Sequence, residues 1–71
     1  MDQQHLLDRL RLCEAHIARG EHSLARQRRT VARLEHDGHD TSVAKQLLDS
    51  FELVQCSSMA ERDRILRALG E

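Results

Sequence analysis

The sequence predicts an all-α protein, a two-helix antiparallel hairpin that dimerises into a four-helix bundle. Three observations predict this fold. Proline is absent from the 71 residues, only three glycines occur, and apolar residues recur at helical spacing in both halves of the chain. Because proline and glycine are the residues that break helices, little interrupts a helix over long stretches. We expect helices over about residues 2–36 and 41–69, in a single helical-hairpin domain that covers residues 1–71.

The first helix is predicted by an unbroken seven-residue repeat. Its spacings alternate between four and three residues along Leu6, Leu10, Cys13, Ile17, Gly20, Leu24, Gln27, Val31 and Leu34. This is the spacing with which one helix packs along another. Leu7, Leu12 and several alanines widen the stripe beyond a strict coiled-coil seam, as is typical of bundle helices.

A tight turn is predicted at His36-Asp37-Gly38-His39-Asp40. Gly38 can take the left-handed conformation that ends a helix, and Asp40 or Thr41 is the expected cap of the next one. A connection of about four residues makes two helices antiparallel neighbours.

The second helix has a broad apolar face, interrupted by polar residues around Cys56-Ser57-Ser58 and Glu61-Arg62. Folding the chain about Gly38–His39 pairs Leu34 with Val43, and Gly20 with Ser57 and Ser58. Small residues therefore face each other at Gly20. Either the helix axes approach closely there, or a partner's side chain fills the gap.

The apolar face of each helix is wider than its one neighbour can cover, and a chain of this length draws little stability from its own core. A second copy stacked face to face would give a symmetric four-helix bundle, and a helix of another protein laid into the groove is the alternative. We expect a non-catalytic oligomerisation or protein-interaction module. Its predicted core and interaction residues are Leu10, Ile17, Leu24, Val31, Leu34, Leu47, Phe51, Val54, Ile65 and Leu66.

No catalytic or cofactor-binding constellation is predicted, because the chain has no supported Ser-His-Asp arrangement and no glycine-rich phosphate loop. His36 and His39, with Asp37 and Asp40, have side chains that bind divalent metals. A polar turn is the favoured interpretation, because Asp and His suit turns and helix ends, and no further ligand is evident without a second chain. We therefore expect no metal and no other cofactor, and the chain is not expected to be an enzyme.

Arg19, Arg26 and Arg33 recur every seven residues, with Arg28 and Arg29 beside them. A nucleic-acid surface would use such a strip for phosphate contacts. The net charge is −1, however, and Phe51 is the sole aromatic residue available for base stacking. A solvated flank that pairs with acids such as Asp49, Glu52 or Glu61 on a neighbour is the favoured interpretation. A regulatory protein that binds a metal through the His/Asp turn, or nucleic acid through the Arg-rich flank, is the alternative function.

The N-terminal residues lack the basic and apolar segments of a secretory signal, and no apolar run approaches the length of a membrane span. Cys13 occupies a core position, whereas Cys56 lies near the edge of the second stripe. Within one hairpin the two lie about two helical turns apart, too far for a disulfide, so a bridge would have to join two chains. We expect a cytoplasmic protein with reduced thiols and no membrane partner.

Several segments resemble short uncharacterised helical proteins of alphaproteobacteria, rhizobia and their relatives in particular. The resemblance covers about residues 10–70, and its most specific part is the turn motif Arg33-Leu34-Glu35-His36-Asp37-Gly38-His39-Asp40-Thr41. Residues 16–21, Ala25-Arg26-Gln27, Leu47-Leu48, Phe51-Glu52 and Arg62-Asp63-Arg64 share in it. The resemblance implies a bacterial, cytoplasmic protein and brings no activity, cofactor or catalytic residue.

Overall fold

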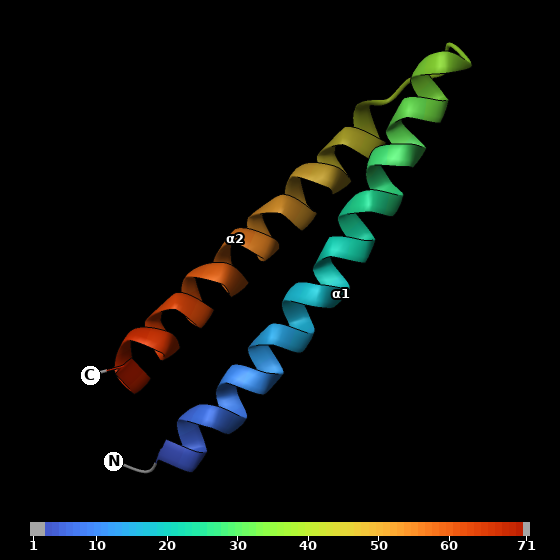
Figure 1. Cartoon of the computed structure of the whole chain (residues 1–71). Helices are drawn as coiled ribbons and strands as arrows, with labels where there is room; N and C mark the ends of the chain where they lie inside the picture. Colours follow the sequence, from blue (N-terminus) through green and yellow to red (C-terminus); the bar gives the residue numbers. More distant parts are fainter. Residues whose placement is uncertain (1–2, 71) are drawn as a thin grey trace.

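The protein is a two-helix antiparallel hairpin, described over residues 3–70 in a computed structural model (Figure 1). Helix α1 (Gln3–His36) and helix α2 (Ser42–Gly70) lie side by side, and the hairpin measures 55 × 14 × 14 Å. The prediction of an all-α hairpin is confirmed. Helix α1 ends where predicted, α2 begins and ends one residue later than predicted, and the predicted start at Asp2 lies outside the described residues.

The turn depends on Gly38, whose backbone φ of +75° lies in the left-handed region. The N–H of Gly38 donates to the carbonyl of Glu35 at 3.2 Å, and the N–H of His39 donates to that of Leu34 at 2.9 Å. This pair of bonds is the Schellman motif, which satisfies carbonyls that the end of a helix leaves without partners. The predicted role of Gly38 is confirmed.

The start of α2 is capped by the side chain of Asp40, one of the two predicted alternatives, and Thr41 stands directly before the first helical residue. The Asp40 carboxylate accepts hydrogen bonds from the backbone N–H of Ser42 at 2.9 Å and from its hydroxyl at 2.7 Å. The carbonyl of Thr41 accepts the helical bond from the N–H of Lys45 at 2.8 Å. The Ser42 hydroxyl, and then the Ser42 backbone N–H, lower the pKa of Asp40 from its ordinary 3.8.

The seam between the helices uses every position of the α1 repeat. Leu6, Cys13, Ile17, Leu24 and Val31 are buried, and the residues between them in the repeat are half-buried: Leu10, Gly20, Gln27 and Leu34. Ile65 of α2 joins Leu6, Cys13 and Ile17 in one apolar cluster, against which Leu10 and Leu69 pack. The α1 heptad is therefore confirmed as the side that faces α2.

Helix α2 turns a less apolar face to the seam than the sequence suggested. Its buried and half-buried positions include a second repeat of alternating four- and three-residue spacings: Ala44, Leu48, Phe51, Gln55, Ser58, Arg62, Ile65 and Leu69. Leu47, Val54 and Leu66, which were predicted as core or interaction residues, lie outside the seam of this hairpin and are 44%, 65% and 46% exposed. A helix in contact with one neighbour buries one narrow seam, and these three residues lie beside it.

Polar side chains cross the seam to backbone carbonyls of the opposite helix. The amide of Gln55, which is 7% exposed, donates to the carbonyl of Ile17 at 2.9 Å. The Gln27 amide donates to the carbonyl of Ala44 at 2.9 Å, and the Cys13 thiol donates to that of Ser58 at 3.0 Å. Satisfied buried polar groups of this kind favour one register of a helix pair over its alternatives.

The position opposite Gly20 differs from the prediction. A Cβ atom built on Gly20 would lie 1.9 Å from Oε1 of Gln55, so this side chain occupies the space that a larger residue at position 20 would need. Gln55, rather than Ser57 or Ser58 alone, faces Gly20. The pairing of the helices is thus shifted by about two residues from the one predicted, and neither small-against-small packing nor a partner's side chain is needed to fill the gap.

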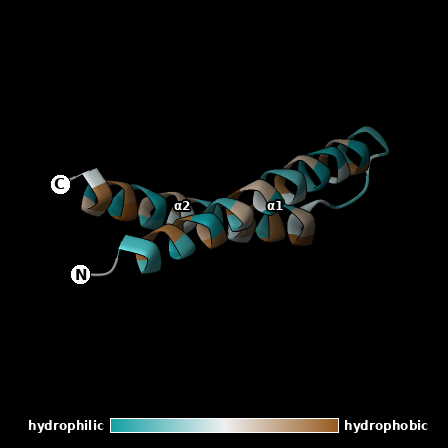
Figure 2. Ribbon diagram, turned by 60° about the horizontal axis from the view of Figure 1, so that its bottom comes forward, coloured by the Kyte–Doolittle hydropathy of each residue, from teal (hydrophilic) through white to brown (hydrophobic). Residues whose placement is uncertain are grey.

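Apolar residues recur along both helices, whereas the turn is hydrophilic (Figure 2). Neither helix is long and apolar enough, over the described residues, to cross a membrane.

Candidate helix-docking surface

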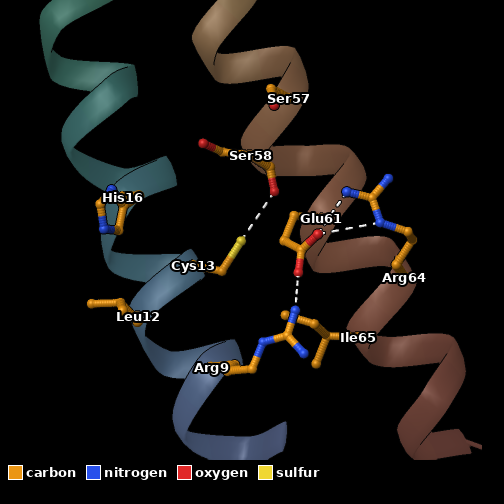
Figure 3. A pocket seen from close by; sticks show the side chains of 9 residues that line it. All are labelled: Arg9, Leu12, Cys13, His16, Ser57, Ser58, Glu61, Arg64 and Ile65. Atoms are coloured by element: carbon orange, nitrogen blue, oxygen red, sulfur yellow. Dashed lines mark hydrogen bonds and ion pairs between the residues drawn. The ribbon is translucent and has the colours of Figure 1, made fainter.

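Open grooves follow one side of the seam. One, of about 370 Å³, is lined by Arg9, Leu12, Cys13, His16, Ser57, Ser58, Glu61, Arg64 and Ile65 (Figure 3). The next, of about 300 Å³, is lined by His16, Arg19, Gly20, Ser23, Phe51, Val54, Gln55 and Ser58. Because they share His16 and Ser58, the grooves continue one another along the hairpin.

We call this side the groove face. It comprises the lining residues of the two grooves and those one or two heptads further along the same flanks, chiefly Arg26, Arg33 and Leu47. Residues seven apart lie nearly above one another on a helix, so Arg26 and Arg33 follow Arg19, and Leu47 precedes Val54.

Small side chains create the grooves. Ser23 of α1, and Ser57 and Ser58 of α2, line them at levels where larger residues would fill the space. Gly20 also lines the second groove, but Gln55 occupies the space beside it. Cys13 lines the 370 Å³ groove, and its thiol donates a hydrogen bond to the Ser58 carbonyl (Figure 3).

Glu61 lies between two arginines at one end of the groove face, as Figure 3 shows. Its carboxylate forms an ion pair with Arg9 of α1 and another, at 2.6 Å, with Arg64 of α2. The hydrogen bond from Arg64 is the largest cause that lowers the pKa of Glu61; partial burial opposes this shift, and the charges of Arg64 and Arg9 add to it. This carboxylate therefore stays ionised and neutralises part of the local positive charge.

The remaining arginines of this face have no such neutralisation. Arg19, Arg26 and Arg33 are exposed, and no ion pair or hydrogen bond of their guanidinium groups joins them to another described residue. At a rise of 1.5 Å per residue, successive members of this row are about 10 Å apart. Of the predicted strip, Arg28 pairs with Glu52 as expected. Arg19, Arg26 and Arg33 do not pair with Glu61, which is held by Arg9 and Arg64.

The groove face also carries exposed apolar side chains. Val54 and Leu47 of α2 are 65% and 44% exposed, and Leu12 of α1 is 61% exposed. The row Arg19, Arg26 and Arg33 thus follows Leu12 on the α1 side of the face, while Leu47 and Val54 lie on the α2 side, which also carries Arg64. Groups of these two kinds can hold carboxylates and apolar side chains, respectively.

The opposite side of the seam, which we call the ion-pair face, has a different character. Lys45 pairs with Glu35 at 3.2 Å, and Arg28 pairs with Glu52 at 4.0 Å, so charges of both signs bridge the two helices there. Leu66 follows Glu52 by two heptads and is exposed on this side. The arginines predicted as one strip are therefore divided between two faces.

The structure does not bring together the other candidate groups, the metal ligands of the turn and the two cysteines, over the described residues. Within residues 3–70 no group of three or more His, Cys, Asp or Glu side chains gathers as metal ligands, at the turn or elsewhere. Both cysteines are free thiols, Cys13 buried and Cys56 exposed.

The predicted interaction residues are distributed over three places. Ile17, Leu24, Val31 and Ile65 are buried in the seam, with Leu10, Leu34 and Phe51 half-buried beside them; Leu47 and Val54 lie on the groove face, and Leu66 on the ion-pair face. Sequence reasoning placed Leu12 on the widened apolar stripe and named Glu61 as a partner for the arginine strip, but it assigned neither of them, nor His16, to a groove. The position of Leu12 seven residues before Arg19 is the signal that could have placed it on the same flank of the helix as the arginine row.

No protein-family model matches the chain, and neither a curated protein nor a solved structure is detectably similar to it.

Proposed function

We propose that this protein is a non-catalytic helix-interaction module that uses its groove face to bind other helices. The observation that carries the proposal is the exposure of Leu47 and Val54 on α2, while Gln55 and Ser58 occupy the seam. Full burial of an apolar side chain stabilises a protein by about 1.5–3 kcal/mol. The isolated hairpin gains only part of this stabilisation from Leu47 and Val54, and a partner that covers them would supply the rest. Aliphatic residues beside an open groove are typical of surfaces that receive a partner.

The simplest such interaction is self-association. Two hairpins stacked with their groove faces together would form a four-helix bundle with two-fold symmetry. A two-helix layer has one narrow core, and association supplies the burial that small domains lack. We further propose a cytoplasmic location, in keeping with the free thiols of Cys13 and Cys56, and the bacterial origin that the resemblance implies.

Sedimentation equilibrium over a range of protein concentrations tests this proposal. We expect the wild-type protein to approach twice its monomer mass of 8.2 kDa, and the double variant Leu47→Gln/Val54→Gln to remain a folded monomer, because both side chains are exposed in the hairpin. Leu53→Gln is the matched control, since Leu53 is 73% exposed and lies outside the groove face. It should leave the dimer intact.

A wild-type protein that stays monomeric and well folded at every concentration would refute self-association. A dimer that survives the double variant but is disrupted by Leu53→Gln would place the interface elsewhere and refute the role of the groove face.

A further inference from the structure

We infer that the preferred occupant of the groove face is an acidic amphipathic helix of a partner protein. This inference rests on the proposed function and names the chemistry of the partner. It depends on charge: the groove face is positive, so an acidic partner complements it, whereas a second copy of the same face does not.

The positive charge of this face is largely unmatched within the hairpin. Arg9 and Arg64 share the single carboxylate of Glu61, while Arg19, Arg26 and Arg33 pair with no described residue. A partner helix that lies along the groove and bears Glu or Asp at seven-residue intervals would meet this row in step, since both repeats are about 10 Å long. Arginine binds carboxylates through two parallel hydrogen bonds, so such pairs also set the register.

The arrangement of the face also specifies where the apolar side chains of the partner lie. Leu47 and Val54 follow the α2 side of the grooves, and the arginine row follows the α1 side. The partner helix therefore needs aliphatic residues along one edge and carboxylates along the adjacent edge. The small residues Ser23, Ser57 and Ser58, which line the grooves, leave room for aliphatic side chains of the partner.

A second copy of the chain matches only half of this requirement. Stacked groove face to groove face, it would cover Leu47 and Val54 but bring a second row of arginines. Glu35 and Glu52 lie on the ion-pair face, where Lys45 and Arg28 already hold them. Self-association should therefore be weak at low ionic strength, and an acidic helix should displace the second copy.

Nucleic acid is the other polyanion that an arginine row could bind. A single straight row on one helix provides phosphate contacts, but the aliphatic side chains of Leu12 and Val54 beside it can form no hydrogen bonds to base edges. The apolar side of the face favours an amphipathic helix.

Two designed peptides of about 24 residues test this inference, because that length matches the span from Arg9 to Arg33. Both carry leucines along one edge; the adjacent edge carries glutamates in one and lysines in the other. Binding to the full chain is measured by fluorescence anisotropy at about 0.05 M and 0.5 M salt, between which the Debye length falls about threefold. We expect the glutamate peptide to bind at least tenfold more tightly than the lysine peptide at low salt, and to weaken as salt rises.

Two triple variants assign this binding to the arginine row. Arg19→Gln/Arg26→Gln/Arg33→Gln should weaken the glutamate peptide roughly tenfold, as expected for three exposed ion pairs. The control Arg11→Gln/Arg29→Gln/Arg67→Gln removes the same charge from exposed arginines that do not line the grooves, and should have little effect. Circular dichroism checks that both variants keep their helicity.

The outcomes separate this inference from the proposed function. Equal binding of the two peptides, or equal losses in the two triple variants, would overturn the acidic partner while the docking surface stands. Failure of both peptides to bind a monomeric protein would overturn the proposed function as well. Duplex DNA that binds as tightly as the glutamate peptide, unaffected by Leu47→Gln/Val54→Gln, would overturn the inference in favour of a nucleic-acid surface.

Discussion

At the scale of single residues, the contact between Gly20 and Gln55 determines how closely the two helices approach. Glycine within a helix is unfavourable by about 1 kcal/mol relative to alanine. A Cβ at Gly20 would nevertheless lie 2.8 Å from Cδ of Gln55, whose side chain is buried and bonded to the Ile17 carbonyl. Glycine at this position therefore makes room for a buried polar side chain.

We predict that Gly20→Ala destabilises the hairpin by about 1 kcal/mol in urea unfolding. The Gln55 amide must leave its hydrogen bond, and an unsatisfied buried amide costs about 1–3 kcal/mol, which exceeds the gain of about 1 kcal/mol in helix propensity.

The Gln55→Ala background provides the control for this prediction. With the long side chain removed, Gly20→Ala should become stabilising by about 1 kcal/mol, because only helix propensity remains. If Gly20→Ala has the same sign in both backgrounds, the proposed coupling between positions 20 and 55 is wrong.

At the scale of the elements, the turn combines a left-handed glycine with a capped start of α2. Gly38 has φ +75°, and a Cβ there would meet no atom within 4 Å, so only backbone conformation restricts this position. We expect Gly38→Ala to cost about 1 kcal/mol and Gly38→Asn less, since Asn tolerates the left-handed region better. Thermal unfolding of the two variants measures the difference, and equal melting temperatures for both variants and wild type would contradict it.

The cap at Asp40 predicts a dependence of stability on pH. Its pKa is lower in the folded protein than its ordinary 3.8, because the carboxylate accepts hydrogen bonds from Ser42. The contribution is therefore fully present above pH about 4 and is lost as the pH falls through the folded pKa. Asp40→Asn, which keeps an acceptor but does not titrate, should remove this part of the acid-induced drop in melting temperature. If the melting temperatures of wild type and Asp40→Asn fall by the same amount between pH 5 and pH 2, the ionised carboxylate has no capping role.

At the scale of the whole molecule, the hairpin has one narrow seam and therefore little stability to spare. Leu24 is buried in this seam. Leu24→Asp should abolish helicity and association together. Loss of the buried leucine costs about 2–5 kcal/mol, and desolvation of the new carboxylate adds to this cost. The core of a chain of this size supplies only roughly 3–5 kcal/mol of stability in total. Circular dichroism and light scattering follow the two properties, with the exposed Leu53→Asp as control. A well-folded Leu24→Asp monomer would rule out an obligate dimer.

The charge of the groove face gives self-association an unusual dependence on salt. If two copies meet through this face, rows of arginines approach each other, and screening relieves their repulsion. The dimer should therefore become tighter as salt rises from about 0.05 M to 0.5 M in sedimentation equilibrium. A dimer that weakens over this range is held by opposite charges, and its interface would then include the ion-pair face.

Most of the fold was predictable because its signals are local. The heptad from Leu6 to Leu34 sets the inward face of α1, and Gly38 with Asp40 sets the turn, since each depends on neighbours along the chain. The face of α2 was harder to predict, because Gln55, Ser58 and Arg62 occupy seam positions where an apolar pattern was sought. Leu47 and Val54 resemble core residues in the sequence, yet they form part of the candidate docking surface.

The sequence by itself determined two long helices, their antiparallel pairing and the residues that α1 turns inward. Periodicity and turn chemistry act within a few residues of each position, so no knowledge of the neighbour is needed. Only the tertiary structure decided which residues of the broad apolar face of α2 are buried in the seam, and which arginines share a face with the exposed Leu47 and Val54. That choice depends on the register between the helices, and the register depends on contacts between residues far apart in the chain, such as Gln55 against Gly20.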